Sequence, residues 1–524
     1  MAGLASVAWA CCYAAILTAV PRVRPALAAS PPPPPPPPVV CVGEDISLQE
    51  LADEGCEIVQ GSVLISGIGA GQTDGGTVSN ALLAQVTGDF TISGSTNGGL
   101  VVLDFSTLES VGGALVSNDQ STSPLQVVSF DALTTVGDTL EFSFNSDLQN
   151  LGLIALANVG GPFTVNNNAA LATLDLPQLS TVGGALSLTN GLGEVSASAL
   201  ESVGGNFQVQ NTQIASLEFD ALASVGLTVD VQDNADLVTF ALPALTSAGS
   251  LSISDLASLS QLELGSLQTI NSGASFLGAD TVAQIELPQL QQIGGDLVVA
   301  NNLALETFSA SQLQTIGNDM TITGNPALAM LDMPQLEDVN NILTITSMGG
   351  SAGEVDLSAL GSVENGITLE NNPGLVSVDL GSLNNVAGDL LCSDNAALAQ
   401  IDLAALTSVN GNLIFTQNAN LPQLNIDELS SVQQSFNLES NAQLQAVSSG
   451  SLQNIGGSFV VTNCDALAAL ALPALASVSG SVGFVVSSNS ALQDLSGGTS
   501  QLDIGGPLNV TENGELALLS LSCV

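Results

Sequence analysis

The sequence predicts an all-β protein that folds as a right-handed parallel β-solenoid of about 20 coils, from Val59 to Ile504. Two observations lead to this fold class. A unit of about 23 residues repeats along the chain, and apolar residues alternate with polar ones inside each unit. A fixed period of this size is typical of solenoids, in which each repeat buries its apolar residues against its neighbours.

The repeat is recognised by a small or branched apolar residue that precedes a Gly or Asn corner. Residues 167–188 read NNAALATLDLPQLSTVGGALSL, and residues 325–345 read NPALAMLDMPQLEDVNNILTI. The anchor residues follow one another at 21 to 24 positions, and they are Val159, Val182, Val203, Val225, Ala248, Ile270, Ile293, Ile316, Val339, Val363, Val386, Val409, Val432, Ile455 and Val478. Weaker copies extend the series to Val59 on one side and Ile504 on the other.

Each unit contains two extended runs. In the unit that starts at Val386, the apolar residues are Leu390 and Cys392, followed after a turn by Leu398, Ile401, Leu403 and Leu406. Alternation with period two is the pattern of a strand with one buried face. A unit of this length with its apolar residues so far apart has no room for a long helix, so we expect each unit to form one coil.

Asparagine recurs at one corner of the unit, at Asn145, Asn168, Asn234, Asn302, Asn325, Asn372, Asn395, Asn418 and Asn441. Stacked coils place these side chains about 4.8 Å apart. Amides at that spacing can hydrogen-bond along the stack and tolerate the left-handed backbone of a tight corner. We therefore predict a structural ladder in preference to a binding site.

The unit L-x-x-L-x-L-P-x-L-x-x-V-G-G-x-L-x-I-x-x-N resembles the receptor L-domain branch of the leucine-rich-repeat solenoids. That branch includes ligand-binding L domains of growth-factor receptors and GPI-anchored fungal cell-wall proteins. The chain differs from the fungal members in lacking a long apolar C-terminal tail, and from the receptors in lacking a cysteine-rich module and a following membrane span. The resemblance implies a solenoid platform, and such platforms serve many functions.

The ends differ from the repeats. Residues 1–30 contain an apolar run, Leu4 to Val20, and an Ala26-Leu27-Ala28 cleavage site, which predicts a signal peptide. Because Arg22 and Arg24 follow the apolar run, an uncleaved signal anchor is the alternative, and it would be the only membrane attachment. Residues 31–38 form a polyproline spacer of about 25 Å, or a ligand for a proline-binding module or a target for hydroxylation and glycosylation.

We assign residues 39–60 to an N-terminal cap, 61–504 to the solenoid and 505–524 to a C-terminal cap. Cys41 and Cys56 bracket the first strand-like segment, and a secreted chain favours a disulfide between them. Cys392 occupies a core position and Cys464 replaces an Asn of the ladder, while Cys523 is the candidate for an intermolecular bond. No C-x-x-C spacing suggests a zinc site.

Charge excludes several functions. The chain has 2 basic residues against 49 acidic ones and no His, and both basic residues, Arg22 and Arg24, lie in the predicted signal. Nucleic acid and P-loop nucleotide binding both need cations, so neither is expected. Catalysis by Ser-His-Asp or Cys-His groups, and His-metal chemistry, lack their base or ligand. Only carboxylate chemistry remains.

Acids recur at one outward position of the second extended run, at Asp175, Glu286, Asp332, Asp379 and Asp402, with Glu218, Glu263 and Asp356 near the same register. Two carboxylates about 4.8 Å apart in water repel by about 0.9 kcal/mol. This acidic stripe predicts binding of divalent cations, and oxygen ligands suit Ca²⁺ best. The alternative is a solvated face with diffuse counterions.

We expect a non-catalytic, secreted structural or recognition protein of the cell surface or cell wall, with an extracellular protein or glycan as partner. One alternative is a carboxylate-only polysaccharide hydrolase, because an inverting glycosidase needs only two carboxylates about 6.5–9.5 Å apart. Another is ice or mineral-surface binding, for which Thr321, Thr323, Thr344 and Thr346 would stack. Asn509, in Asn509-Val510-Thr511, is the one N-glycosylation sequon.

Overall fold

The computed structural model describes residues 36–68, 76–93, 99–118 and 125–523. The chain divides into Met1–Pro38 and Val39–Val524, and all helices and strands of the described residues lie in the second unit. The predicted signal peptide, its alternative as a signal anchor and most of the polyproline spacer lie outside the described residues. Among the described residues, no helix is long and apolar enough to cross a membrane.

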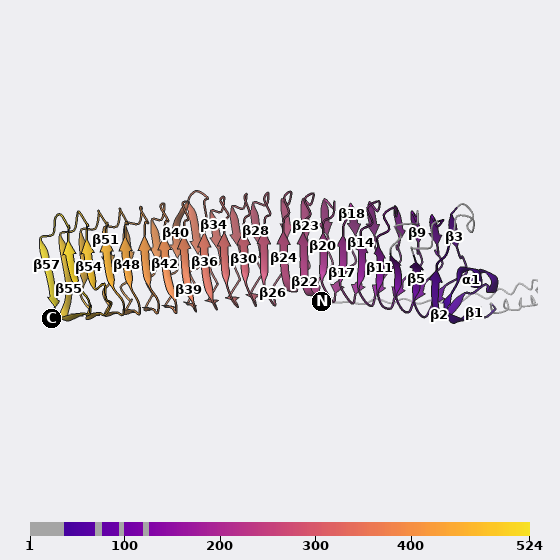
Figure 1. The fold of residues 1–524 in the computed structure, drawn as a ribbon, viewed down its shortest axis with the longest axis horizontal. Coiled ribbons are helices and arrows are strands. Elements are labelled where there is room, and N and C mark those ends of the chain that lie inside the picture. Colours follow the sequence, from indigo (N-terminus) through magenta and orange to yellow (C-terminus); the bar gives the residue numbers. More distant parts are fainter. Residues whose placement is uncertain (1–35, 69–75, 94–98, 119–124, 524) are drawn as a thin grey trace, which may run out of the picture. The chain divides into compact units, whose positions relative to one another are not determined.

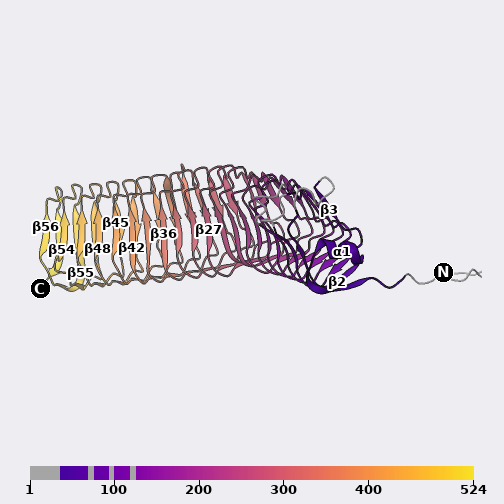
Figure 2. The same ribbon diagram turned by 45° about the vertical axis from the view of Figure 1, so that its right-hand side comes forward.

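Residues Val39–Val524 form a parallel β-solenoid of about 19 turns of about 23 residues, which confirms the predicted fold class. Figure 1 shows the strands arranged side by side from β2 to β57, and Figure 2 shows the same stack turned. Each coil contributes a short strand A, a longer strand B and, after a turn, a strand C. Every pairing between coils is parallel.

Strand A ends at the branched or small apolar anchor of the repeat. The separate A strands are β4 Gln85–Val86, β7 Ser110–Val111, β10 Thr135–Val136, β13 Asn158–Val159, β16 Thr181–Val182, β19 Ser202–Val203, β26 Thr269–Ile270, β29 Gln292–Ile293, β32 Thr315–Ile316, β35 Asp338–Val339, β38 Ser362–Val363, β41 Asn385–Val386, β44 Ser408–Val409, β47 Ser431–Val432, β50 Asn454–Ile455 and β53 Ser477–Val478.

Strand B pairs in the same 42-stranded sheet as strand A. The B strands are β5 Phe90–Ser93, β8 Leu115–Asn118, β11 Leu140–Ser143, β14 Phe163–Asn166, β17 Leu186–Thr189, β20 Phe207–Gln210, β27 Ala274–Leu277, β30 Leu297–Ala300, β33 Met320–Thr323, β36 Ile342–Thr346, β39 Gly366–Glu370, β42 Asp389–Ser393, β45 Leu413–Thr416, β48 Phe436–Glu439, β51 Phe459–Thr462, β54 Phe484–Ser487 and β56 Leu508–Thr511. In β2 Ile58–Ile65, β22 Ser224–Gln232 and β24 Ser247–Ser254, strands A and B are continuous.

Strand C forms the third face, which we call face C. Its strands are β3 Thr77–Ser79, β6 Val102–Asp104, β9 Val127–Ser129, β12 Asn150–Gly152, β15 Thr173–Asp175, β18 Glu194–Ser196, β21 Ser216–Glu218, β23 Thr239–Ala241, β25 Gln261–Glu263, β28 Gln284–Glu286, β31 Thr307–Ser309, β34 Met330–Asp332, β37 Gly353–Asp356, β40 Leu375–Asp379, β43 Gln400–Asp402, β46 Gln423–Asn425, β49 Ala446–Ser448, β52 Ala469–Leu472, β55 Asp494–Ile504 and β57 Leu518–Cys523. Strands therefore also lie within 505–524, the segment we assigned to a C-terminal cap.

The core contains the apolar stripes that the repeat predicts. In the coil from Val386 to Val409, the inward residues Leu390, Cys392 and Leu403 are at most 1 % exposed. Phenylalanines of neighbouring coils pack edge to face, as Phe436 and Phe459 do at 5.4 Å between ring centroids. Such pairs add about 1 kcal/mol to the burial of the rings.

The Gly corner has a steric cause. A Cβ at Gly160 would lie 2.2 Å from the carbonyl oxygen of Gly137, and one at Gly183 would lie 2.2 Å from that of Gly160. Because stacked coils bring these backbones together, a side chain at the corner would force them apart.

The asparagine ladder is present. The backbone N–H of Asn372 donates to Oδ1 of Asn395 at 3.1 Å, and that of Asn395 donates to Oδ1 of Asn418 at 3.3 Å. One detail of the prediction is wrong, because the left-handed residue is the one before the ladder position, such as Asn371 (φ 54°) or Asp394 (φ 57°). The ladder side chain must point inward to bond the next coil, so its predecessor makes the corner.

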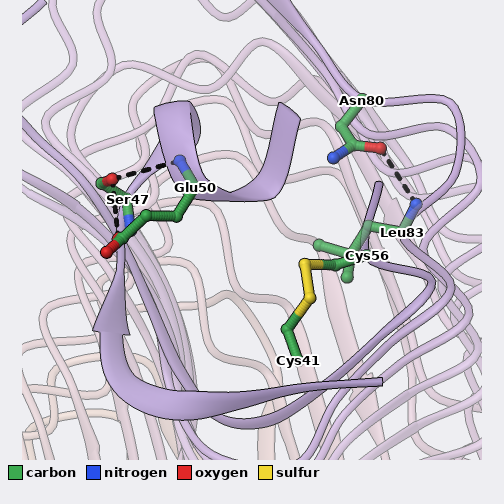
Figure 3. Close-up of a disulfide and its surroundings, with 6 residues drawn as sticks. All are labelled: Cys41, Ser47, Glu50, Cys56, Asn80 and Leu83. Atoms are coloured by element: carbon green, nitrogen blue, oxygen red, sulfur yellow. Dashed lines mark hydrogen bonds between the residues drawn. A yellow bond between two sulfur atoms is a disulfide. The ribbon is translucent and has the colours of Figure 1, made fainter. Parts of the chain in front are cut away.

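The N-terminal end is closed by a strand and a helix (Figure 3). Strand β1 (Val40–Ile46) pairs in parallel with β2, and helix α1 (Leu48–Glu54) follows with a capping box made by Ser47 and Glu50. The hydrogen bonds from Ser47 hold the pKa of Glu50 below its usual value. The predicted disulfide joins Cys41 to Cys56 across this cap, with 5.7 Å between the Cα atoms.

Candidate functional site on face C

Four aspartates of face C occupy one continuous column. Asp332 pairs in register with Asp356, Asp356 with Asp379, and Asp379 with Asp402. We call these four residues the aspartate ladder. Adjacent rungs of a parallel sheet lie about 4.8 Å apart, so the four carboxylates form a row on consecutive coils.

The other predicted stripe residues do not join this row. Glu286 is separated from Asp332 by Ser309, and Asp175 pairs in register with Ser196. Glu218 and Glu263 lie on either side of Ala241. Of the five residues predicted for the stripe, Asp332, Asp379 and Asp402 therefore belong to the ladder.

Turns hold one oxygen of three ladder carboxylates, while Oδ2 of the fourth, Asp332, accepts a hydrogen bond from Ser309 Oγ at 2.8 Å. Oδ1 of Asp356 accepts a hydrogen bond from the N–H of Ser358 at 3.0 Å, and Oδ1 of Asp379 accepts one from Gly381 at 2.9 Å. Asp402 repeats this pattern with the N–H of Ala404 at 3.0 Å. These bonds orient the carboxylates, which lets the second oxygen face the neighbouring rung or solvent.

Gly381 keeps the space between two ladder carboxylates free. A Cβ at this glycine would lie 3.2 Å from Oδ1 of Asp379 and 3.3 Å from Oδ2 of Asp402. Both oxygens therefore border one small opening on the surface.

Nothing basic in the described residues neutralises the ladder, because the chain's only two basic residues, Arg22 and Arg24, lie outside them. The four carboxylates form a row, so their oxygens do not converge on one point as the ligands of an enclosed metal site do. Among the described residues, the one group whose ligand atoms converge is Cys41, Glu54 and Cys56, and its two thiols form the disulfide. A cation on the ladder would bridge adjacent rungs and take its remaining ligands from water.

Face C is interrupted four times along the stack. Its C strands form separate sheets of four, two, three and six strands and a last group, β46, β49, β52, β55 and β57, that belongs to the 42-stranded sheet; the gaps lie between β12 and β15, β18 and β21, β25 and β28, and β43 and β46. Within the sheets, the N–H after a C strand typically bonds the end of the next C strand, as Leu357 does to Asp379 O at 3.0 Å. Among the described residues, this bond is absent at Leu153, Ala197, Leu264 and Leu403, which border the gaps, and at Ser449, whose Oγ donates to Ala471 O at 3.2 Å.

Each gap opens a cavity. The cavity between β12 and β15 measures about 320 Å³, the one between β18 and β21 about 440 Å³, the one between β25 and β28 about 300 Å³, and the one between β43 and β46 about 320 Å³. Three predicted stripe residues, Asp175, Glu286 and Asp402, line these cavities. We call the cavities the face C crevices.

The sequence analysis missed Asp131 and Glu194, which line two crevices together with predicted residues. One signal was available for the first crevice. Gly152 ends strand β12 at a position that elsewhere on face C carries Asp, Glu, Ser, Ala or Asn. The interruption itself leaves no mark in the repeat.

The outward face of the B strands does not support a regular threonine surface. Thr321, Thr344 and Thr368 stack in one column, and Thr346 Oγ1 donates to Thr323 Oγ1 at 2.7 Å. The columns end within a few coils, at Val298 and Ala300 on one side and at Leu391 and Glu370 on the other.

Besides Glu50 in the N-terminal cap, two carboxylates outside the ladder have shifted pKa values. Burial among the B strands raises the pKa of Asp230, although hydrogen bonds from Gln208 and Ser252 oppose the shift. Asp427 has a lowered pKa because Ser448 Oγ and the N–H of Gly450 donate to its Oδ1. Neither lies in a crevice.

Cys392 and Cys464 are free, buried thiols. Burial raises the pKa of Cys392 to about 12, and burial also raises that of Cys464. Both therefore remain protonated at neutral pH and behave as packing residues. The side chain of Cys523, the predicted intermolecular partner, lies outside the described side chains.

The fold and the site define the class of protein, which is a parallel β-solenoid with a carboxylate-bearing third face. No family model matches the chain, and no curated protein does. Among solved structures it is similar to a leucine-rich repeat protein from Bacteroides ovatus, with 13 % identity and a TM-score of 0.29 over 73 % of this chain and 82 % of that one. It is also similar to TLR13 in a complex with ssRNA13, with 10 % identity and a TM-score of 0.13 over 82 % and 89 % of the two chains. Scores this low support no argument about function.

Proposed function

We propose that this protein is a non-catalytic extracellular recognition or structural protein of the cell surface, whose aspartate ladder binds divalent cations, with Ca²⁺ the best match. The continuous register of Asp332, Asp356, Asp379 and Asp402 carries the proposal. Folding brings these carboxylates to a fixed spacing, and no basic side chain among the described residues offsets their repulsion. An oxygen-preferring divalent cation would bind the folded ladder better than the unfolded chain.

Calcium is expected to stabilise the fold beyond simple screening. Millimolar CaCl₂ should raise the melting temperature of the purified protein more than NaCl of equal ionic strength, because a ligand that prefers the folded state stabilises it by mass action. Replacing Asp332, Asp379 and Asp402 together by Asn should remove roughly half or more of the calcium-specific rise, since three of the four rungs lose their charge. Circular dichroism or calorimetric melts measure both effects.

A matched control changes the same net charge elsewhere. Glu141, Glu370 and Glu439 point outward from B strands, and their register neighbours are uncharged. Replacing these three by Gln should leave the calcium-specific rise unchanged. Equal stabilisation by the two salts in the wild-type protein would show that the ladder is only a solvated face.

A carboxylate-only polysaccharide hydrolase is the second candidate. Ladder residues one rung apart lie close to the spacing of about 5–5.5 Å used by retaining glycosidases. The general acid of such an enzyme lies in an apolar pocket, whereas the ladder carboxylates lie on an open face. We therefore favour the non-catalytic function.

Localisation and a hydrolysis screen distinguish the two candidates. A tagged full-length chain is expected at the cell surface or in the medium, and a screen of cell-surface polysaccharides should show no turnover. Turnover that disappears when one ladder Asp is replaced by Asn would establish the hydrolase instead. A pull-down from the cell-surface fraction, with and without EDTA, would then identify the partner.

A further inference from the structure

The face C crevices are built from backbone as well as side chains. At the gap between β12 and β15, the N–H of Leu153 and the carbonyl of Asp175 lack the bond that joins the corresponding groups of paired coils. Leu153 is 0 % exposed, so its N–H is buried beneath the surface of face C. An unmade backbone bond at such depth is costly unless another group provides a partner.

Gly152 makes room for the carboxylate of Asp131 in this crevice. A Cβ there would lie 2.3 Å from Oδ1 of Asp131, which extends from the preceding coil and whose Oδ2 accepts a hydrogen bond from Ser129 Oγ at 2.7 Å. Asp175 approaches from the following coil, and Ile154, 50 % exposed, forms an apolar wall. The crevice thus combines two carboxylates and an apolar side chain, above a backbone bond that is not made.

The chemistry of this lining selects its ligand. Carboxylates and carbonyls accept hydrogen bonds, so the ligand must offer several donors, and hydroxyl groups also accept from an N–H. An anionic ligand would meet two carboxylates without any cation beside them. A cavity of about 320 Å³ is the size of a small-molecule site. A neutral sugar unit has these properties: many hydroxyls, no charge and an apolar ring face.

We propose that the face C crevices are subsites for a neutral polysaccharide chain, and that the crevice at Gly152 is one of them. The inference rests on the proposed function and names its ligand. The first two gaps are separated by two C strands, β15 and β18, which is about 10 Å. One extended chain lying across face C can therefore occupy both, and two weak subsites on one chain reinforce each other.

Titration of the full-length protein with defined oligosaccharides tests the inference. The probes are cellohexaose, laminarihexaose, mannohexaose and chitohexaose, each in EDTA so that calcium does not contribute, with hexagalacturonate as the anionic comparison. At least one neutral hexasaccharide should bind saturably by calorimetry, and hexagalacturonate should not bind. Gly152→Val should weaken the neutral ligand by about tenfold or more, because the new side chain fills the crevice and displaces Asp131.

Ser309→Val is the matched control, because it places the same side chain at the same position of face C within the uninterrupted six-stranded sheet. It should bind as the wild type does. Asp175→Ala is the second test variant, in case Gly152→Val does not fold. Because Asp175 is exposed, its replacement should keep the fold, and it should weaken binding of the neutral ligand. Absence of binding to every neutral probe, or equal binding by wild type, Gly152→Val and Asp175→Ala, overturns the inference.

The outcomes also separate this inference from the proposed function. A surface-located protein that captures a protein partner but binds no neutral oligosaccharide loses only the crevice assignment. If the protein binds a neutral oligosaccharide at the Gly152 crevice but is found inside the cell, the crevice proposal stands and the proposed extracellular location is wrong.

Discussion

Replacing Asn395 by Ala is expected to destabilise the solenoid by about 3 kcal/mol or more, because several buried hydrogen bonds depend on this one side chain. Its Oδ1 accepts from the N–H and Nδ2 of Asn372 at 3.1 and 3.0 Å. Its Nδ2 donates to the carbonyl of Leu369 at 2.8 Å. Asn372 and Asn395 are both 0 % exposed, so water cannot replace the hydrogen-bond partner that the substitution removes.

Asn437→Val is the matched control. The Oδ1 of Asn437 is buried without a hydrogen-bond partner, between Ile414 and Val460 on neighbouring strands. Valine removes the unpaired group and suits a strand, so stability should stay equal or rise by about 1 kcal/mol. Guanidinium transitions compare the two variants, and hydrogen exchange locates the loosened coils, since repeats unfold partly independently. If Asn395→Ala cost no more than Asn437→Val, the ladder would not be structural.

Removing the disulfide is expected to unfasten the N-terminal cap. The double change Cys41→Ala and Cys56→Ala opens a ring with a sequence separation of 15 residues, which corresponds to about 3 kcal/mol. Because a solenoid coil contacts only its neighbours, the effect should be local. Hydrogen exchange should become faster in β1, α1 and β2 and stay unchanged in β42.

Reduction of the wild-type protein provides the control, since it breaks the same bond without changing the sequence and should reproduce the exchange pattern. Unchanged protection of α1 in both samples would show that the capping box of Ser47 and Glu50, together with burial of Leu51, holds the cap without the disulfide.

Much of the fold could be predicted because each coil obeys the same local rules. Leu390 and Cys392 alternate with outward residues and are buried, and Asn395 bonds the adjacent coils, as the repeat indicated. The Cys41–Cys56 bond could be predicted from two cysteines near the start of a chain for which the sequence predicts secretion. The left-handed corner was misplaced by one residue, because the sequence cannot show which of two adjacent polar residues points inward.

The candidate site was only partly predictable. The sequence indicated Asp332, Asp379 and Asp402 as one stripe, but it placed Asp356 only near their register. The interval from Asp332 to Asp356 is 24 residues, and the pairing of β34 with β37 is regular, so the connection between these two strands takes up the extra residue and Asp356 joins the row. Conversely, Asp175 and Glu286 have the right spacing and lie apart from it.

The sequence by itself determined the period, the buried stripes, the corner residues and the net charge of −47, because each depends on residue type within one unit. Only the tertiary structure decided which carboxylates form the aspartate ladder and where face C separates into crevices. Both depend on how successive backbones stack. One extra residue in a turn can shift or preserve the register of the next strand. A small divergence between two coils breaks their hydrogen bonds, as at Leu153 or Ala197, while the core beneath stays packed.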